Sequence, residues 1–155
     1  PTEKKYASIV HNFVAQWFND PAFTMEQLME QIKPGGLMVA SFPGEKTFPE
    51  WQQQCRQLKI PYTGNTLPDV EEMVVKLSVG PHQVDFYEDT IKQHFSTALD
   101  FFRMLHALGA HTKFGNEQLS TGELRRLISH WDTQADNEPI TVSWHIVFLA
   151  VKKDT

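Results

Sequence analysis

The sequence predicts an α/β fold in which strands and helices alternate and pack in layers. Two observations support this prediction. Apolar, β-branched runs of strand length alternate with segments whose apolar residues recur at helical spacing, and short turn-forming stretches separate them. The chain has 155 residues, 41% hydrophobic and 21% charged, a size and composition typical of one domain with a core of its own. We expect a single domain or half of one.

The N-terminal part predicts a strand, a helix and a second strand. Residues 6–10 form a β-branched run, and the Asp-Pro pair at 20–21 is typical of a helix start. The Lys-Pro-Gly-Gly stretch at 33–36 predicts the end of that helix, and the apolar run at 37–42 predicts the next strand. This order is typical of a right-handed parallel crossover unit.

The middle of the chain predicts two more helices and a strand. Residues 47–50 match a capping box ahead of the apolar positions of one helix. Apolar residues at helical spacing over 67–77 predict the next helix, which ends at Gly80. Residues 83–87 then predict a strand.

The last part predicts two capped helices and a long strand. Ser96 and Ser120 are the expected N-caps of these helices, and Gly109 closes the first of them. The run at 140–151 is β-branched and aromatic, which favours a strand.

Charge and composition exclude several classes of protein. A formal net charge of −5 gives little attraction for nucleic acid, so we expect no nucleic-acid partner. The longest apolar run, 146–151, is far shorter than the roughly 20 residues that span a bilayer, so we expect no membrane partner. A single cysteine, Cys55, and the absence of a signal-peptide pattern favour a reducing, cytoplasmic location.

The sequence contains no recognisable catalytic motif. Its glycines do not form a dinucleotide-binding or P-loop pattern, and its seven histidines lack metal-ligand spacing. Cys55 lies on the apolar side of a predicted helix, which favours a buried core residue over a nucleophile. The acidic residues are scattered. We therefore assign no catalytic residue and no metal.

The ends of the strands are the better candidates for a site, because ligands of open parallel sheets bind outside the carboxyl ends of the strands. His11, Asn12 and Phe13 follow the first predicted strand. The alternative is that Asn12 caps a turn and Phe13 packs into the core. Arg103 is a cation in an otherwise apolar helix, where it either reaches to solvent or binds an anion. His106 lies on the same side of that helix.

Several of these motifs resemble a known family. The stretch from His11 to Trp17 and the Lys-Pro-Gly-Gly stretch before a strand resemble the fourth and fifth strand region of class I S-adenosylmethionine-dependent methyltransferases. Ala98-Leu99 with Arg103, then Gly109-Ala110 and later Pro139-Ile140-Thr141 resemble the malonyl-acyl-carrier-protein O-methyltransferases of biotin synthesis. The sequence departs from that family at His11, where serine is usual, and at His106, where lysine is common. It also has no counterpart of the first three strands, with their glycine-rich loop and acidic ribose ligand.

The resemblance implies the C-terminal part of a Rossmann-like sheet. The last strand would be antiparallel and lie between its neighbours, with an extra helical insertion before it. This gives crossover units over 1–93, a substrate-side helical insertion over 94–138 and the final strand over 139–155.

The resemblance also implies an activity and a site. S-adenosylmethionine would be bound by His11, Asn12 and Phe13, and the substrate by Arg103, His106 and Lys113. The methyl group would pass to the free carboxylate of malonyl-acyl-carrier protein. Because that carboxylate is already ionised at neutral pH, no general base is required.

The missing strands define the expected partners. These are an N-terminal methyltransferase half, or further copies of the chain, together with acyl-carrier protein, and we expect the chain to be inactive without the cofactor-binding half. Strand 6–10 should leave an open sheet edge that seeks a partner. One alternative is a non-catalytic subunit or truncated module that binds a complete methyltransferase or carrier protein. Another is a small-molecule binding domain that only shares the fold.

Overall fold

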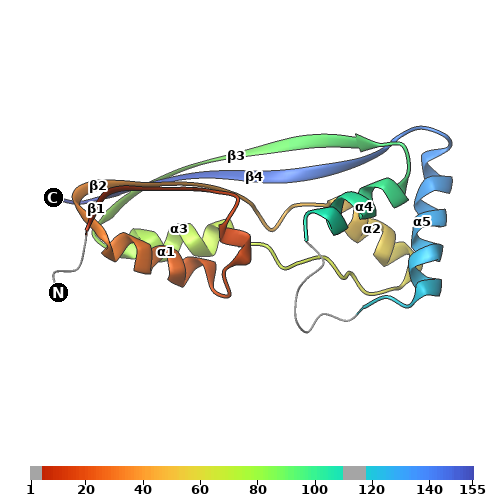
Figure 1. The fold of residues 1–155 in the computed structure, drawn as a ribbon, viewed down its shortest axis with the longest axis horizontal. Coiled ribbons are helices and arrows are strands. Elements are labelled where there is room, and N and C mark those ends of the chain that lie inside the picture. The colour runs from red at the N-terminus through yellow and green to blue at the C-terminus, as the bar shows by residue number, and fades with distance from the viewer. Residues whose placement is uncertain (1–4, 110–117) are drawn as a thin grey trace. The chain divides into compact units, whose positions relative to one another are not determined.

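The structure is a computed structural model that describes residues 5–109 and 118–155 (Figure 1). Strands and helices alternate along the chain, which confirms the predicted α/β class. The strands are β1 (Tyr6–Asn12), β2 (Ile32–Pro43), β3 (His82–Phe95) and β4 (Ile140–Lys153). The helices are α1 (Pro21–Glu30), α2 (Pro49–Leu58), α3 (Val70–Val79), α4 (Ala98–Ala107) and α5 (Thr121–Ala135), with a short 3-10 turn at Ala15–Trp17.

The four strands form one mixed sheet in the order β1-β2-β4-β3. β1 runs parallel to β2, with Ile9 opposite Met38, whereas β4 runs antiparallel to β2, with Leu149 opposite Ala40. The last strand of the chain is therefore antiparallel and lies between β2 and β3. This confirms the sheet arrangement that the family resemblance implied.

The chain divides into two compact units. Unit 1 contains the chain up to Thr47 together with Thr66–Thr90 and His145–Thr155, and unit 2 contains Phe48–Asn65 and Ile91–Trp144. The long strands β3 and β4 contribute residues to both units. The boundaries expected from the sequence, at 93–94 and 138–139, cut the chain at other points because they follow chain order rather than packing.

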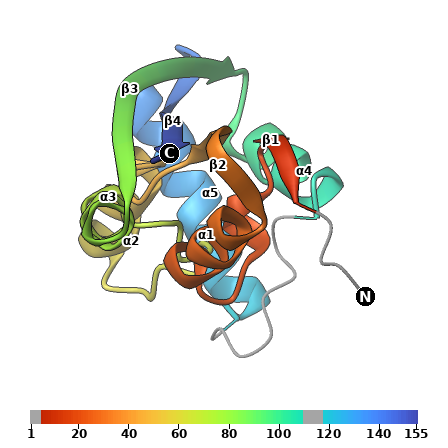
Figure 2. The same cartoon turned by 90° about the vertical axis from the view of Figure 1, so that its left-hand side faces the viewer.

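Unit 1 is a sheet with helices on one face. Figure 2 views this unit along its strands and shows α1 and α3 on the same side. Side chains from these helices pack against the sheet in a fully buried core that includes Met25, Met29, Met38, Phe42, Met73, Leu77, Val147 and Leu149. An aspartate side chain caps the N-terminus of each helix. Asp20 accepts a hydrogen bond from the Phe23 backbone N–H, and Asp69 accepts one from the Glu72 backbone N–H. The predicted Asp-Pro helix start is confirmed.

The Lys-Pro-Gly-Gly stretch lies within the irregular start of β2, rather than ahead of the strand as predicted. The register moves from Tyr6 opposite Ile32 to Ser8 opposite Leu37, so extra residues of β2 bulge out of the ladder. Gly35 has a φ of 75°, and a Cβ on Gly36 would lie 2.6 Å from the carbonyl oxygen of Ala7. Gly35 therefore permits the left-handed turn of the bulge, and Gly36 lets β1 approach β2 closely.

Unit 2 encloses an aromatic core between α2, α4 and α5. Its rings meet edge to face, with Phe101 5.1 Å from Phe48 and 5.6 Å from Trp131 between centroids. Tyr62 packs on Trp51 at 4.7 Å, and burial raises the pKa of its phenol to about 12. Cys55 is buried in the same core, as predicted. No helix in the described part of the chain is long and apolar enough to cross a bilayer.

Of the other three predicted helix starts, two are wrong and one is confirmed. The capping box at 47–50 does not form, because Glu50 accepts hydrogen bonds from the backbone and hydroxyl of Ser143 instead. Thr97, rather than Ser96, caps α4 and accepts from the Asp100 N–H. Ser120 forms the predicted cap of α5, with a reciprocal bond from its own N–H to Glu123.

Candidate functional site

The first candidate site is the loop that leaves the carboxyl end of β1. The backbone N–H of Phe13 donates to the carbonyl of Ser41 at 2.7 Å, and the Gln16 side-chain amide donates to the carbonyl of Phe13 at 2.7 Å. Phe13, whose backbone makes both of these bonds, has a φ of 54°, a left-handed conformation that is uncommon for a bulky residue. The sheet therefore holds this loop in a strained conformation, a feature that clusters at functional sites.

Asn12 and Phe13 both point toward open surface. Asn12 is opposite Ser41 in the ladder, and the Ser41 hydroxyl donates to the Asn12 side-chain oxygen. This bond to the neighbouring strand replaces the turn cap considered as the alternative for Asn12. Phe13 is 40% exposed and does not pack into the core, so the alternative for this residue is also wrong.

His11 points to the opposite face of the sheet from Asn12. Its Nε2 atom lies 3.2 Å from the Met25 sulfur, and its ring contacts Phe18 edge-on at 6.3 Å between centroids. Burial lowers the pKa of this imidazole, which favours the neutral form at pH 7. The two-residue period of a strand separates His11 from Asn12. The structure therefore brings Asn12 and Phe13 together but directs His11 toward α1.

Sequence reasoning overlooked two residues of this loop. Val14 and Trp17 are exposed, Trp17 by 52%, so they join Phe13 in an apolar surface beside the carboxyl ends of β1 and β2. We call Asn12, Phe13, Val14, Trp17 and Ser41 the strand-end cluster. The available signal was three bulky apolar residues within five positions directly after a strand.

Sequence reasoning also overlooked a buried histidine. His145 accepts a hydrogen bond at Nδ1 from the Lys46 backbone N–H at 3.3 Å, so its Nε2–H donates to Glu88 at 2.7 Å. A Cβ on Gly44 would lie 2.4 Å from the ring, so this position requires glycine. His145 fixes the loop that follows β2. Nothing in the apolar run of β4 marked it in advance.

The predicted substrate residues lie on α4 in unit 2. Arg103 is exposed, and its guanidinium lies 3.5 Å from the Asp100 carboxylate one turn earlier. His106 is also exposed, three residues further on. Arg103 reaches solvent, which is one of the two alternatives that the sequence left open, and its exposed charge remains accessible to an anion. Lys113 lies outside the described residues.

The described residues bring no three His, Cys, Asp or Glu side chains together as a metal site.

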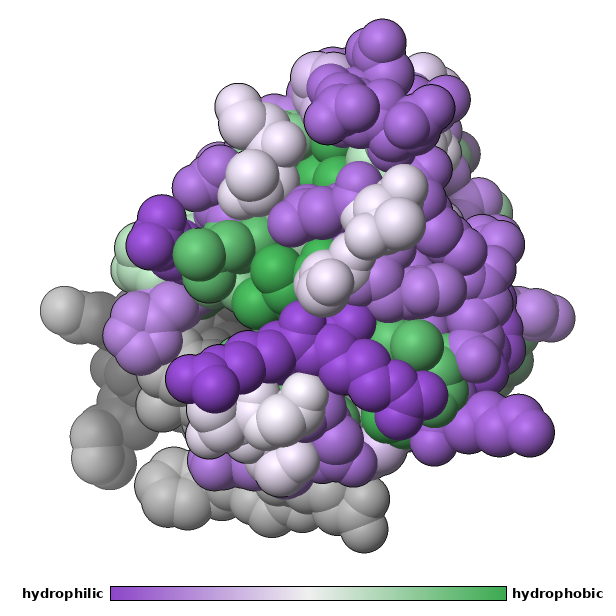
Figure 3. Space-filling model, turned by 90° about the vertical axis from the view of Figure 1, so that its right-hand side faces the viewer, coloured by the Kyte–Doolittle hydropathy of each residue, from purple (hydrophilic) through white to green (hydrophobic). Residues whose placement is uncertain are grey.

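Figure 3 shows the face of the molecule at the α5 end, where polar side chains cover most of the surface and apolar atoms are exposed between them.

Comparison with solved structures defines the class of fold. The chain superposes on the YcgJ protein of Bacillus subtilis with a TM-score of 0.60, at 12% identity, over 99% of this chain and 66% of that one. It superposes equally well on a candidate methyltransferase of Bacillus halodurans C-125, at 11% identity, over 100% of this chain and 67% of that one. The fold is a class I methyltransferase-like α/β fold.

Sequence relatives narrow the class, although no protein-family model matches the chain. The chain is 28% identical to a malonyl-[acyl-carrier protein] O-methyltransferase of Magnetococcus marinus, over 90% of this chain and 51% of the relative. It is 24% identical to one of Ilyobacter polytropus and 25% identical to one of Priestia megaterium, over 98% and 97% of this chain. The resemblance to these methyltransferases is confirmed. The chain spans about half to three fifths of their length.

Proposed function

We propose that this chain is the substrate-side part of an S-adenosylmethionine-dependent O-methyltransferase that esterifies the free carboxylate of malonyl-acyl-carrier protein. The observation that supports the proposal is similarity to proteins of that name over nine tenths or more of this chain. The mixed sheet agrees with it, because β4 occupies the antiparallel position between β2 and β3. The link to biotin synthesis rests on the family resemblance.

The residues of the strand-end cluster fit one end of the cofactor. S-adenosylmethionine supplies a methyl group on a sulfonium cation, and aromatic faces such as those of Phe13 and Trp17 attract cations. Asn12 offers a side-chain amide that can bind an amino-acid end group. His11 contributes from the other face of the sheet, by packing against Met25 and so setting the path of the loop.

The methyl transfer requires no acid or base catalyst among the chain's own side chains. The acceptor carboxylate is ionised at neutral pH, so the work is to orient the acceptor and exclude water. Arg103 would orient the carboxylate through charge-assisted hydrogen bonds, with His106 beside it. No proton has to move to or from the enzyme during the transfer.

The cofactor's adenosine end has no binding motif in this sequence, which contains no glycine-rich strand-to-helix turn. We therefore propose that a second polypeptide segment supplies that part of the site, and that the chain alone is inactive. An assay for methyl ester on malonyl-acyl-carrier protein, by intact-mass analysis, tests this. The chain alone should give no ester, and the chain mixed with the unmatched part of the Magnetococcus marinus relative should give it. Ester formation by the chain alone would contradict the proposal.

A non-catalytic role is the second candidate, and the missing adenosine motif is the observation that favours it. A truncated module would bind a methyltransferase or carrier protein without turnover. Complex formation without any methyl ester, at saturating cofactor, would support this role over catalysis.

A further inference from the structure

A buried histidine of unit 1, His145, is enclosed by the loop Gly44–Thr47 that leaves the carboxyl end of β2. The Gly44 N–H donates to the His145 carbonyl at 2.8 Å, and the His145 N–H donates to the Thr47 hydroxyl at 3.1 Å. His145 is only 5% exposed, and the Nδ1 atom of its ring accepts from the Lys46 N–H at 3.3 Å. The main chain and the ring of His145 therefore both hold this loop.

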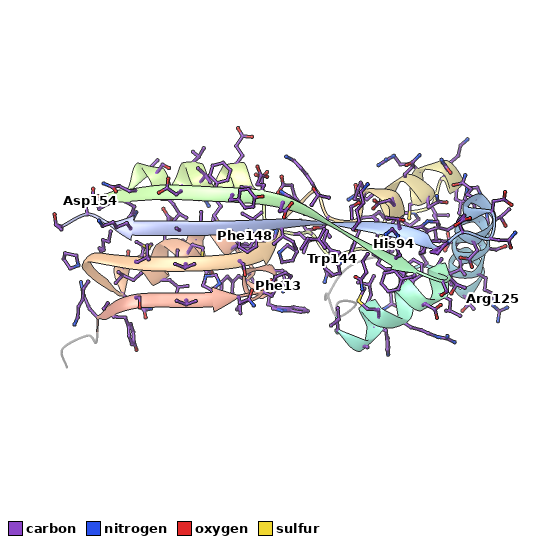
Figure 4. The ribbon with its side chains drawn as sticks, turned by 90° about the horizontal axis from the view of Figure 1, so that it is seen from above. Phe13, His94, Arg125, Trp144, Phe148 and Asp154 are labelled. Atoms are coloured by element: carbon purple, nitrogen blue, oxygen red, sulfur yellow. The ribbon has the colours of Figure 1, made fainter. Side chains whose placement is uncertain are left out.

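The loop borders the edge of the sheet that carries the strand-end cluster. β1 and β2 are parallel, with Asn12 opposite Ser41, so both strands end at the same edge. Figure 4 shows Phe13 at this end of β1. Because ligands of such sheets bind outside the carboxyl ends of the strands, the position of loop 44–47 helps to set the shape of the candidate site.

Charged side chains face the imidazole from the loop and from β3. The Nε2–H donates to the Glu88 carboxylate at 2.7 Å, and the Glu45 carboxylate lies 3.9 Å from Nδ1. The exposed ammonium group of Lys46 lies 3.9 Å from the Glu88 carboxylate. Glu45 also accepts from the Val70 N–H at 3.2 Å, which connects the loop to the first turn of α3. The ring therefore has a carboxylate near each nitrogen, and the Lys46 ammonium lies near one of these carboxylates.

The hydrogen bond at Nδ1 depends on the protonation state of the ring. In a neutral imidazole with its proton on Nε2, the lone pair of Nδ1 can accept from the Lys46 N–H. In a protonated imidazole both nitrogens carry a proton, so Nδ1 can no longer accept. The Glu45 carboxylate is then the nearby acceptor, but at 3.9 Å it is too far for a hydrogen bond. Protonation therefore breaks the bond to Lys46 and favours a movement of the loop that brings Glu45 to the ring.

We propose that His145 is a positioning residue, which holds loop 44–47 at the edge of the candidate site while its ring is neutral and releases the Lys46 N–H when its ring is protonated. Acid would thus change the shape of the site without protonating a reacting group. The inference deepens the proposed function, on which it rests for the use made of this edge of the sheet. Since the proposed methyl transfer needs no acid or base catalyst, a dependence of its rate on His145 protonation would report the position of the loop.

NMR spectroscopy of the full 155-residue chain tests the proposal. The ring nitrogen shifts of His145 should show the Nε2–H tautomer at about pH 8, and a titration to about pH 5 covers the range in which histidines change charge. The hydrogen-exchange protection factor of the Lys46 N–H, which already corrects for the pH dependence of intrinsic exchange, should fall about fivefold as His145 protonates. That factor is the loss expected for one ordinary hydrogen bond.

Two histidine variants form a matched pair for this titration. His145→Asn removes the titrating ring but keeps an oxygen that can accept from the Lys46 N–H, so the Lys46 protection factor should no longer depend on pH. His82→Gln is the control and should keep the full response. His82 lies on β3 in the same unit, but its ring contacts the Leu77 carbonyl rather than the loop.

Glu88→Gln is a second test, which leaves the histidine in place and decides the matter if His145→Asn does not fold. Without the carboxylate beside Nε2 the protonated ring is less stable, so the Lys46 response should move to lower pH. An Nδ1–H tautomer, a Lys46 protection factor that is constant while His145 protonates, or an unshifted response in Glu88→Gln would each overturn the proposal.

An activity measurement separates this proposal from the proposed function. In the mixture with the unmatched part of the Magnetococcus marinus relative, kcat/KM for methyl ester formation should fall with the same midpoint as the Lys46 response. A kcat/KM that shows no change at that midpoint would overturn the positioning role. A full Lys46 response in a mixture that forms no ester would leave the proton-dependent loop in place and contradict the proposed function instead.

Discussion

The two units differ in how completely each one buries its own apolar surface. Unit 2 encloses Phe101 and Trp131 within a ring of aromatic contacts, and both are almost fully buried. Unit 1 buries one face of its sheet equally well but exposes Phe148 and Val10 on the other. The comparison teaches that the described part of unit 2 buries its large aromatic side chains within its own core, whereas unit 1 leaves aromatic and branched side chains exposed on one face of its sheet.

The largest expected effect compares one substitution in the two units. Phe101→Ala should destabilise the chain by about 3–5 kcal/mol, because it leaves a cavity in a close-packed core. Phe148→Ala should change the free energy of unfolding by less than about 0.5 kcal/mol, as exposed substitutions usually do. Urea denaturation of both variants measures the difference. Equal losses of stability would show that Phe148 is buried in solution.

A smaller effect is expected on catalysis in the assembled enzyme. Arg103→Ala should lower kcat/KM for the malonyl substrate about 10- to 150-fold, equivalent to a charge-assisted hydrogen bond of about 1.5–3 kcal/mol. The affinity for the cofactor should stay the same. Because Arg103 is exposed and forms its ion pair with Asp100 of its own helix, stability should change little. Unchanged kinetics would show that Arg103 only reaches solvent and does not bind the substrate.

The helix cap of α5 predicts a modest effect on stability. Ser120→Ala removes the side-chain oxygen that accepts from the Glu123 N–H, which should cost about 1 kcal/mol. Ser129→Ala, at an exposed position in the same helix, is the matched control and should be nearly neutral. A thermal unfolding series on the two variants would distinguish them, and similar shifts in Tm would argue against the capping box.

The smallest expected effect is a pH dependence that arises from His11. Burial lowers the pKa of this imidazole in the folded chain, so the unfolded chain binds the proton more readily. Stability should therefore decline as the pH falls through and below the ordinary histidine value of about 6.5. A His11→Gln variant should lose part of this decline. An unchanged pH profile of unfolding would mean that the imidazole is solvated.

Local signals in the sequence predicted the elements that depend on local contacts. The Asp20-Pro21 start and the Ser120 cap were predictable because their hydrogen-bond partners lie three residues away. The capping box at 47–50 was wrong because Glu50 bonds Ser143, 93 residues away along the chain. β3 extends to Phe95, well beyond the predicted 83–87, because an exposed edge strand shows no apolar alternation in its second half.

The candidate site was predictable only in part. The rule that ligands bind at the carboxyl ends of parallel strands correctly indicated open surface beside Asn12 and Phe13. Grouping these two residues with His11 neglected the alternation of side chains along a strand. Val14, Trp17 and the buried His145 were missed because their roles depend on the loop path and on neighbours distant in sequence. The roles of Arg103 and His106 came from family resemblance, and they remain proposals.

Cofactor binding tests the central claim most directly, because the adenosine end of S-adenosylmethionine has no binding motif in this sequence. Titration calorimetry should detect little or no binding of S-adenosylmethionine to the isolated chain. The same titration into a mixture with the unmatched part of the Magnetococcus marinus relative should show binding at least on the order of a thousandfold tighter, corresponding to about 4 kcal/mol. Tight binding by the isolated chain would contradict the account, since this chain would then hold a complete cofactor site.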